Sequence, residues 1–173
     1  MQARTRKTCL FAVVALGLVV VLAGTALAQS AQPASPLSGT WKLNIAKSTY
    51  SPSNLAPKSG TTQFDVTKDG VKAVVDGVDS QGRATHQEYT ATFDGKDHPW
   101  KGTIAGQPSP NQDAIAWKKI DDHTYEITNK LKGQTLTSSR IVVARDGKSR
   151  TNTTSGKNAQ GVTVNTVAVY DKQ

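Results

Sequence analysis

Short runs in which apolar and polar residues alternate make up most of this chain. The first run, residues 39–45, places Trp41, Leu43 and Ile45 on one face and three polar residues on the other. A period of two is typical of a β-strand with one buried and one solvated face. Because Trp41 directly follows a glycine at the end of an irregular leader, we expect its side chain to fill one end of a barrel or sandwich.

Similar runs continue to residue 170 and are separated by turn-forming residues. Several of the separators are Asp-Gly pairs, which tolerate the positive φ angles of tight hairpin turns. No segment has a helical period. The pattern therefore predicts eight or nine strands, the first at 39–45 and the later ones at 61–68, 71–75, 84–93, 114–120, 125–131, 136–144, 150–155 and 162–170.

Two stretches interrupt this rhythm. Residues Thr49 to Ser59 contain two prolines and several turn formers, so we predict a long loop that lies near a barrel mouth. Residues 97–112 are also irregular, with Trp100 to Ile104 as a short edge strand. Pro108 and Pro110 then indicate a second loop at the mouth.

Strands that follow one another through tight turns must pair antiparallel. A long meander leaves two exposed edges unless its first and last strands meet. We therefore predict an all-β fold in which residues 39–45 pair with residues 162–170, closing an up-and-down β-barrel of about eight to ten strands. A two-sheet sandwich is the alternative.

The N-terminal segment has the features of a secretory signal peptide. Three basic residues precede an apolar stretch over residues 10–23, and Ala26-Leu27-Ala28 supplies the small residues of a cleavage site. We expect residues 1–28 to be a signal peptide, residues 29–36 a flexible linker and residues 37–173 a single domain. The apolar stretch is shorter than the roughly 20 residues of a membrane-spanning helix. The mature protein is expected to lack a membrane span and to reside in the periplasm or outside the cell.

Cysteine and charge narrow the possible functions. The single cysteine, Cys9, lies within the predicted signal peptide, so the mature chain has neither a disulfide nor a thiol nucleophile. The formal net charge of +8 includes three basic residues of that peptide, and the remaining charges are scattered. This pattern is typical of a solvated surface and argues against a nucleic-acid partner. We expect a monomer.

The titratable and nucleophilic residues form no catalytic or metal-binding motif. His86 and Glu88 stand two apart on one predicted strand and face the same side, but no third ligand accompanies them. Serines are numerous, yet none lies in a Gly-x-Ser-x-Gly elbow, and the glycines are spaced as turns rather than as a phosphate loop. We predict no metal, no cofactor and no enzymatic activity. An enzyme would require a pocket in which His86, Glu88 or another titratable pair converges.

The start, the long first loop and the meander together resemble a known class. Gly39-Thr40-Trp41 at the start of the first strand is similar to the opening of the calycins, the lipocalins and fatty-acid-binding proteins. Residues 169–172 are similar to the last strand of the fatty-acid-binding group. The whole mature chain also resembles a group of small exported bacterial proteins of unassigned activity. That second resemblance rests on residues 39–48, 94–99, 119–122, 145–148 and 167–172.

The chain departs from the calycin pattern at informative places. Fatty-acid-binding barrels hold the ligand carboxylate with an arginine two residues before a tyrosine on the last strand, whereas Ala168 precedes Tyr170 here. A proline-rich loop replaces their two-helix lid, and no helix follows the last strand as it does in lipocalins. Binding of fatty acids is therefore not implied by the resemblance.

The resemblance and the predicted barrel suggest a ligand cavity. Thr, Ser and Asn are frequent within the predicted strands and face either a moderately polar cavity or water. Arg140 is a candidate anchor for an anionic group or else a surface arginine, and Trp41 and Tyr170 are assigned structural roles. The candidate lining residues, which are also the obvious core, are Tyr89, Phe93, Trp117, Tyr125 and Ile127. We predict an exported protein that binds a small apolar or amphipathic ligand. The alternative is an envelope structural or interaction module without a small ligand, using an open strand edge or a flat Thr-rich face.

Overall fold

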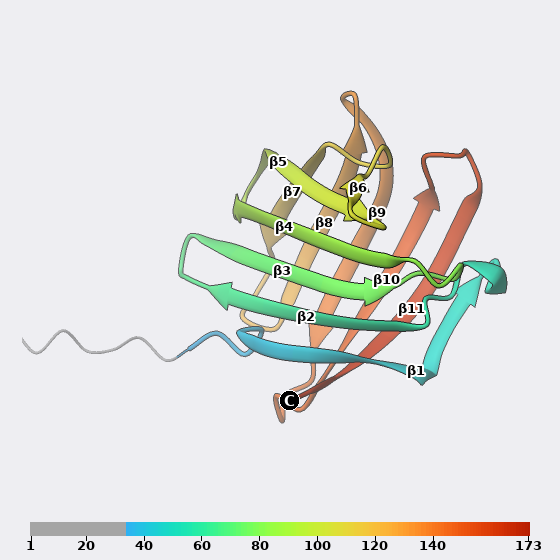
Figure 1. Cartoon of the computed structure of the whole chain (residues 1–173). Helices are drawn as coiled ribbons and strands as arrows, with labels where there is room; N and C mark the ends of the chain where they lie inside the picture. The colour runs from blue at the N-terminus through green and yellow to red at the C-terminus, as the bar shows by residue number, and fades with distance from the viewer. Residues whose placement is uncertain (1–33) are drawn as a thin grey trace, which may run out of the picture. The chain divides into compact units, whose positions relative to one another are not determined.

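The computed structural model describes residues 34–173 (Figure 1). The predicted signal peptide and all but the last three residues of the predicted linker lie outside the described residues. Within 34–173 no helix is both long and apolar enough to cross a membrane. The elements are β1 (Gly39–Ser51), the 3-10 helix η1 (Ser53–Leu55), β2 (Ser59–Val66), β3 (Gly70–Val78), β4 (Ala84–Thr92), β5 (Asp94–Ile104), β6 (Gln107–Pro108), β7 (Ala114–Lys119), β8 (Thr124–Leu131), β9 (Gln134–Val143), β10 (Ser149–Lys157) and β11 (Thr163–Lys172).

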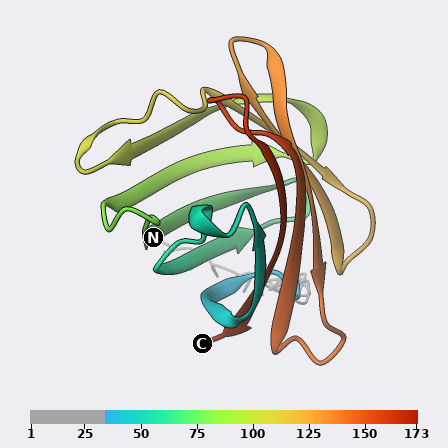
Figure 2. The same ribbon diagram turned by 90° about the vertical axis from the view of Figure 1, so that its right-hand side faces the viewer.

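The strands form one closed antiparallel barrel. Their hydrogen-bonded order is β4-β3-β2-β1-β11-β10-β9-β8-β7-β5-β6, and an additional pairing of β4 with β5 closes the ring. Ten strands form the wall, and the two-residue strand β6 pairs only with the last two residues of β5. Figure 2 shows the strongly curved sheets that this closure produces. The predicted all-β, up-and-down barrel is confirmed.

The closure between the first and last strands also follows the prediction. Trp41 lies opposite Lys172 and Leu43 opposite Tyr170 in the β1–β11 ladder. Because the first and last strands pair in this way, the sheet of residues 34–173 has no long free edge, which was one of the two surfaces that the interaction-module alternative named. The predicted edge strand at residues 100–104 is corrected as well, because these residues belong to β5 and pair with β4 inside the wall.

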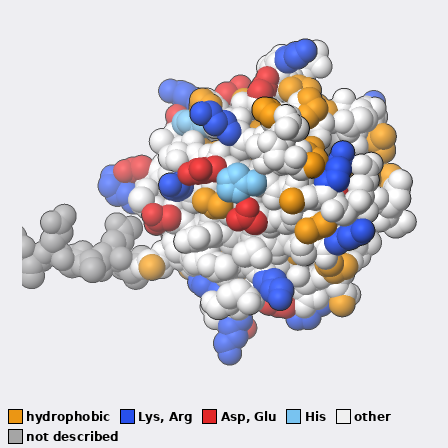
Figure 3. All heavy atoms as spheres, viewed as in Figure 1, with side chains coloured by type: hydrophobic (Ala, Val, Ile, Leu, Met, Phe, Trp, Pro, Cys, Tyr) orange, Lys and Arg blue, Asp and Glu red, His pale blue; other side chains and the backbone are white. Residues whose placement is uncertain are grey.

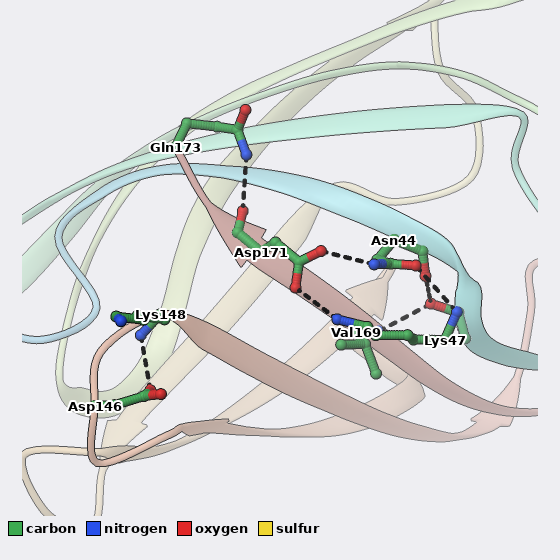
Figure 4. A network of polar contacts seen from close by, with 8 residues as sticks. Asn44, Lys47, Asp146, Lys148, Val169, Asp171 and Gln173 are labelled. Atoms are coloured by element: carbon green, nitrogen blue, oxygen red, sulfur yellow. Dashed lines mark hydrogen bonds and ion pairs between the residues drawn. The ribbon is translucent and has the colours of Figure 1, made fainter.

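A large bulge bends β1 and corrects two further predictions (Figure 4). The ladder with β11 passes from Asn44 opposite Val169 directly to Thr49 opposite Val167. Ile45 therefore leaves the inward-facing series and is 42% exposed. Thr49 and the two residues after it pair with β11 and are strand residues, not the start of a long loop.

Polar groups stabilise the bulge. The Ser48 hydroxyl donates to the Asn44 carbonyl at 2.6 Å and accepts the Val169 amide at 2.9 Å, replacing a ladder partner that the bulge removes. The Asn44 side chain donates to Asp171 at 2.7 Å, and Asp171 also receives Lys47 at 3.4 Å (Figure 4). A buried backbone amide without a partner would be costly, so this local set of contacts allows β1 to change direction.

An aromatic cluster fills the end of the barrel that contains the N-terminal part of β1. The Trp117 ring is surrounded by four rings whose centroids lie 5.7 to 6.3 Å away. These belong to Phe64, Tyr89, Phe93 and Tyr125. Trp41 is also fully buried, and its indole N–H donates to the Leu37 carbonyl at 2.8 Å.

Residues before β1 cover the same end. Ser35 forms a 3.0 Å hydrogen bond with the Tyr125 hydroxyl, and the Ser38 hydroxyl accepts the Val66 amide at 3.3 Å. Leu37, between them, has no exposed surface. This end of the barrel is thus sealed by apolar packing, and the opposite end is the more open one.

Candidate ligand-binding cavity

The interior above the aromatic cluster is hollow. An inner chamber of about 280 Å³ lies within the barrel, and a larger recess of about 920 Å³ lies at its mouth. Gln87, Trp100 and Gln112 line both spaces, so they form the boundary between chamber and mouth. Ligand pockets typically span about 300 to 1,000 Å³. The recess at the mouth falls within that range, and the inner chamber lies just below it.

Four connecting segments form the mouth. They are the η1 region, the β3–β4 turn, the irregular segment after β6, and the β10–β11 turn. A 3.0 Å hydrogen bond from the Gln160 side chain to Asn111 joins the last two segments. The apolar residues that line the mouth include Leu55, Pro57, Ile104, Pro108, Pro110 and Val162. The prediction that the two proline-containing segments lie near the mouth agrees with this geometry.

Trp100 occupies the boundary because the next inward-facing residue of β5 is a glycine. A Cβ atom at Gly102 would overlap the six-membered ring of Trp100. The indole is therefore able to lie against the β5 backbone, where it is only 9% exposed. This arrangement keeps the passage from mouth to chamber open while retaining a large aromatic surface beside it.

The chamber wall combines apolar and hydrogen-bonding side chains. Its apolar surface includes Phe64, Tyr89, Ile115, Ile127 and Ile141. Its polar side chains are Thr62, Gln87, Gln112, Asn129, Ser139, Asn152 and Arg150. Each comes from an inward-facing strand position or, for Gln112, from the segment before β7. The serine, threonine and asparagine residues of the later strands thus face the interior in part.

Hydrogen bonds hold several of these polar side chains in place. Gln112 Nε2 donates to Asn129 Oδ1 at 3.0 Å, and Asn129 Nδ2 donates to Thr137 Oγ1 at 3.0 Å. On the neighbouring strands the hydroxyls of Ser139 and Thr154 lie 2.7 Å apart. Such networks restrict the conformations of these side chains.

Arg150 forms the floor of the chamber, between the cavity and the aromatic cluster. It is 1% exposed, and its guanidinium carbon lies 3.7 Å from the ring centroid of Tyr170 and 5.1 Å from that of Phe64. Nη1 donates to Asn152 Oδ1 at 2.6 Å, while Nε has no hydrogen-bond partner. Register explains the stack, because Arg150 lies directly opposite Tyr170 in the β10–β11 ladder.

No carboxylate compensates this buried cation within residues 34–173. Arg150 forms no ion pair with any described residue. The buried residues of the described chain include no Asp or Glu. Burial lowers the pKa of Arg150 to about 10, which still leaves it protonated at neutral pH. Burial likewise raises the pKa of the Tyr89 hydroxyl, so it stays neutral. The chamber therefore presents a net positive charge to whatever enters it.

The predicted lining residues separate into two groups. Tyr89 and Ile127 line the chamber, and so does Tyr170, to which we had assigned a structural role. The chamber wall does not include the other three, Phe93, Trp117 and Tyr125, which lie deeper in the aromatic cluster. Residue type alone does not distinguish cavity lining from core among these aromatic residues. Their position along the barrel axis does.

Arg140 is not in the chamber. Its side chain is 54% exposed on the outer surface and lies 3.4 Å from Glu126. The arginine inside the barrel is Arg150, which sequence reasoning overlooked because no apolar residue marks the inward face of β10. For Arg140 the sequence did carry a signal, because it alternates with the apolar residues Ile141 and Val143, which are both buried, so it belongs to the opposite face of β9.

His86 and Glu88 lie outside the cavity wall that Tyr89 lines. His86 Nδ1 is 2.7 Å from Asp76, and Glu88 is 3.3 Å from Lys72. The two residues thus have separate partners, although both line one recess beside Trp100 and Lys101. Within residues 34–173 no three His, Cys, Asp or Glu side chains are grouped closely enough to bind a metal ion. On the face shown in Figure 3, basic and acidic side chains are interspersed, as the scattered charges of the sequence predicted.

The closed ten-strand barrel with an internal chamber is an antiparallel up-and-down barrel. Two solved structures are similar to the chain. One is the zebrafish ileal bile acid-binding protein complexed with cholic acid, with 12% identity, a TM-score of 0.46, and coverage of 80% of this chain and 100% of that chain. The other is a redesigned β-barrel, mFAP0, bound to DFHBI, with 16% identity, a TM-score of 0.39, and coverage of 79% and 99%.

Sequence comparisons add no assignment. No protein-family model matches the chain, and none of the curated proteins matches it.

Proposed function

We propose that the protein binds a small amphipathic anion inside the barrel. The observation that carries this proposal is Arg150, a guanidinium buried beneath an open chamber without a carboxylate partner. A buried charge that has no counter-ion is costly, by several kcal/mol even after structural relaxation. Cation–π contacts with Tyr170 and Phe64 offset part of this cost but leave Nε without an acceptor.

The distribution of lining residues supports one orientation for such a ligand. The cationic group lies at the floor of the chamber, whereas leucine, isoleucine, valine and proline side chains gather at the mouth. An anionic group directed inward would meet Arg150, and an apolar part would remain among the mouth residues. An entirely apolar ligand would instead bury its surface against the guanidinium, which is unfavourable.

Native mass spectrometry of the protein, purified without delipidating steps, tests the proposal. We expect a discrete extra mass that solvent extraction releases and that ionises in negative mode. The protein without a bound mass, combined with failure to take up either 8-anilinonaphthalene-1-sulfonate or N-phenyl-1-naphthylamine, would refute ligand binding.

We further propose that the protein acts after export, as a member of the group of small exported bacterial proteins that it resembles. The basic, apolar and small-residue segments of residues 1–28 support this. Expression of the full chain in a bacterial host, followed by cell fractionation and N-terminal sequencing, provides the test. We expect a product that begins at Gln29 outside the cytoplasm. An uncleaved cytoplasmic product would contradict the proposal.

A further inference from the structure

Building on the proposed function, we infer that the ligand carries hydroxyl or carbonyl groups along its body, in addition to its anionic group. The chamber wall carries uncharged polar side chains on several strands, and an unsubstituted acyl chain would leave them without hydrogen-bond partners. This specificity depends on those side chains and adds to the binding of the anion by Arg150.

The polar side chains enclose the chamber rather than occupying one side. Gln87 is on β4, Gln112 precedes β7, Asn129 is on β8, Ser139 is on β9 and Asn152 is on β10. These five residues are here named the polar belt. A ligand body at this level would contact amide or hydroxyl groups on several sides at once.

Parts of the polar belt remain available for hydrogen bonding. Arginine cannot accept a hydrogen bond, so its contact directs Asn152 Oδ1 toward Arg150 and leaves Asn152 Nδ2 without a partner in the described chain. Gln112 Nε2 donates to the Ala114 carbonyl and to Asn129, which leaves Gln112 Oε1 free. The Gln87 amide has no hydrogen-bond partner within residues 34–173. The belt therefore offers donors as well as an acceptor.

The cost of dehydrating these groups selects the ligand. An alkyl segment that displaces water from them provides no replacement hydrogen bond, and each buried group left unpaired reduces affinity about 5- to 150-fold. A hydroxylated or carbonyl-bearing body restores these bonds. The volume of about 280 Å³ lies just below the usual range for pockets that hold drug-sized molecules, which favours a compact ring system over a long chain.

A pair of probes of equal shape tests this inference. We would titrate the protein with 6-hydroxy-2-naphthoate and with 6-methyl-2-naphthoate and measure both dissociation constants by calorimetry or NMR. The carboxylate and the ring system are shared, and hydrophobicity alone favours the methyl compound. We expect the hydroxy compound to bind at least about tenfold more tightly.

Two matched double variants locate the source of the preference. Gln87→Leu with Asn129→Leu removes two inward polar groups, and we expect the methyl compound to become the tighter ligand. Thr90→Leu with Thr128→Leu changes outward positions on the same two strands and should preserve the original preference. If the inner double variant fails to fold, Gln87→Leu alone replaces it, because that substitution breaks no internal hydrogen bond.

The outcomes separate this inference from the proposed function. Equal or tighter binding of the methyl compound to the unaltered protein would overturn the inference but leave anion binding intact. A hydroxyl preference that persists in the inner variant would overturn the role of the polar belt. Binding of neither probe, together with no bound mass in the purified protein, would overturn both proposals.

Discussion

Replacing Arg150 by methionine separates a binding role of this residue from a structural one. Methionine keeps a long, unbranched side chain beneath the chamber but removes the charge and the hydrogen-bond donors. The guanidinium is 1% exposed and its carbon lies 3.7 Å from the Tyr170 ring centroid. If the arginine serves mainly to bind an anion, its removal should affect affinity far more than stability.

The structure gives the expected change in stability. Burial lowers the pKa of Arg150 to about 10, which corresponds to a penalty of roughly 3 kcal/mol on the folded state at neutral pH. Methionine removes this penalty. The substitution also loses a desolvated cation–π contact of about 2 kcal/mol and a hydrogen bond to Asn152 of about 1 kcal/mol. Because the two sides cancel, we expect the unfolding free energy of the ligand-free protein to change by less than about 1 kcal/mol.

The expected change in affinity is much larger for charged ligands. A charge-assisted hydrogen bond contributes about 1.5 to 3 kcal/mol, so 8-anilinonaphthalene-1-sulfonate should bind Arg150→Met about 10- to 150-fold more weakly. N-phenyl-1-naphthylamine has the same rings without the charge, and its affinity should remain within about threefold. Fluorescence titration measures both, and urea unfolding measures the stability.

Arg140→Met serves as the control because Arg140 is exposed on the outer surface. It should change neither dye affinity. The reasoning is refuted if Arg150→Met loses more than about 3 kcal/mol of stability while both dyes weaken equally. That result would assign Arg150 to the stack with Tyr170 and Phe64 as a structural residue.

Three further substitutions test the local structure. Ser48→Ala leaves the Val169 amide of the β1 bulge without its acceptor and should cost about 1 to 3 kcal/mol in urea unfolding, whereas a loss below about 0.5 kcal/mol would contradict the role of the hydroxyl. Ala105 has a φ of 52°, so Ala105→Asn should raise stability by about 0.5 to 1 kcal/mol, and Ala159→Asn, where φ is not positive, should give no such gain. Hydrogen bonds from the Lys96 amide and then from His98 lower the pKa of Asp94 to about 2. The ionised carboxylate therefore stabilises the folded state fully at pH values above the pKa of an unfolded Asp, and this contribution is lost as the pH falls to about 2. The melting temperature of Asp94→Asn should therefore lie below that of the unaltered protein at pH 7 and approach it as pH falls from about 4; a constant difference would contradict this assignment.

Local sequence signals were sufficient for most of the fold. Asp-Gly turns and two-residue alternation predict the strands, and the need to cover sheet edges predicts the β1–β11 closure. The bulge escaped prediction because the alternation of Trp41 and Leu43 continues through Ile45, although the backbone changes direction after Asn44. Only the requirement to pair with β11 reveals the change.

The site was harder to predict, since its position depends on which face of each strand turns inward. On β9 the apolar residue Val142 follows Ile141, and it blurs the alternation although it is 43% exposed. On β10 the inward residues Arg150, Asn152 and Thr154 are polar, so the hydrophobic pattern does not show which alternate residues of this strand face inward. Register supplies it: Arg150 lies opposite both Tyr170 and Val143, each on a neighbouring strand whose inward face is defined.

The contrast between the two ends of the barrel indicates how stability and binding are divided. The sealed end contains Trp41 and Trp117, which have no exposed surface, and the apolar core residues that pack around them. The polar belt and the mouth contribute few buried apolar side chains. Substitutions at the sealed end should therefore unfold the protein, whereas substitutions at the polar belt should change what it binds. Because Arg150 lies at the junction, measuring stability and affinity on the same variants locates the boundary between these two regions.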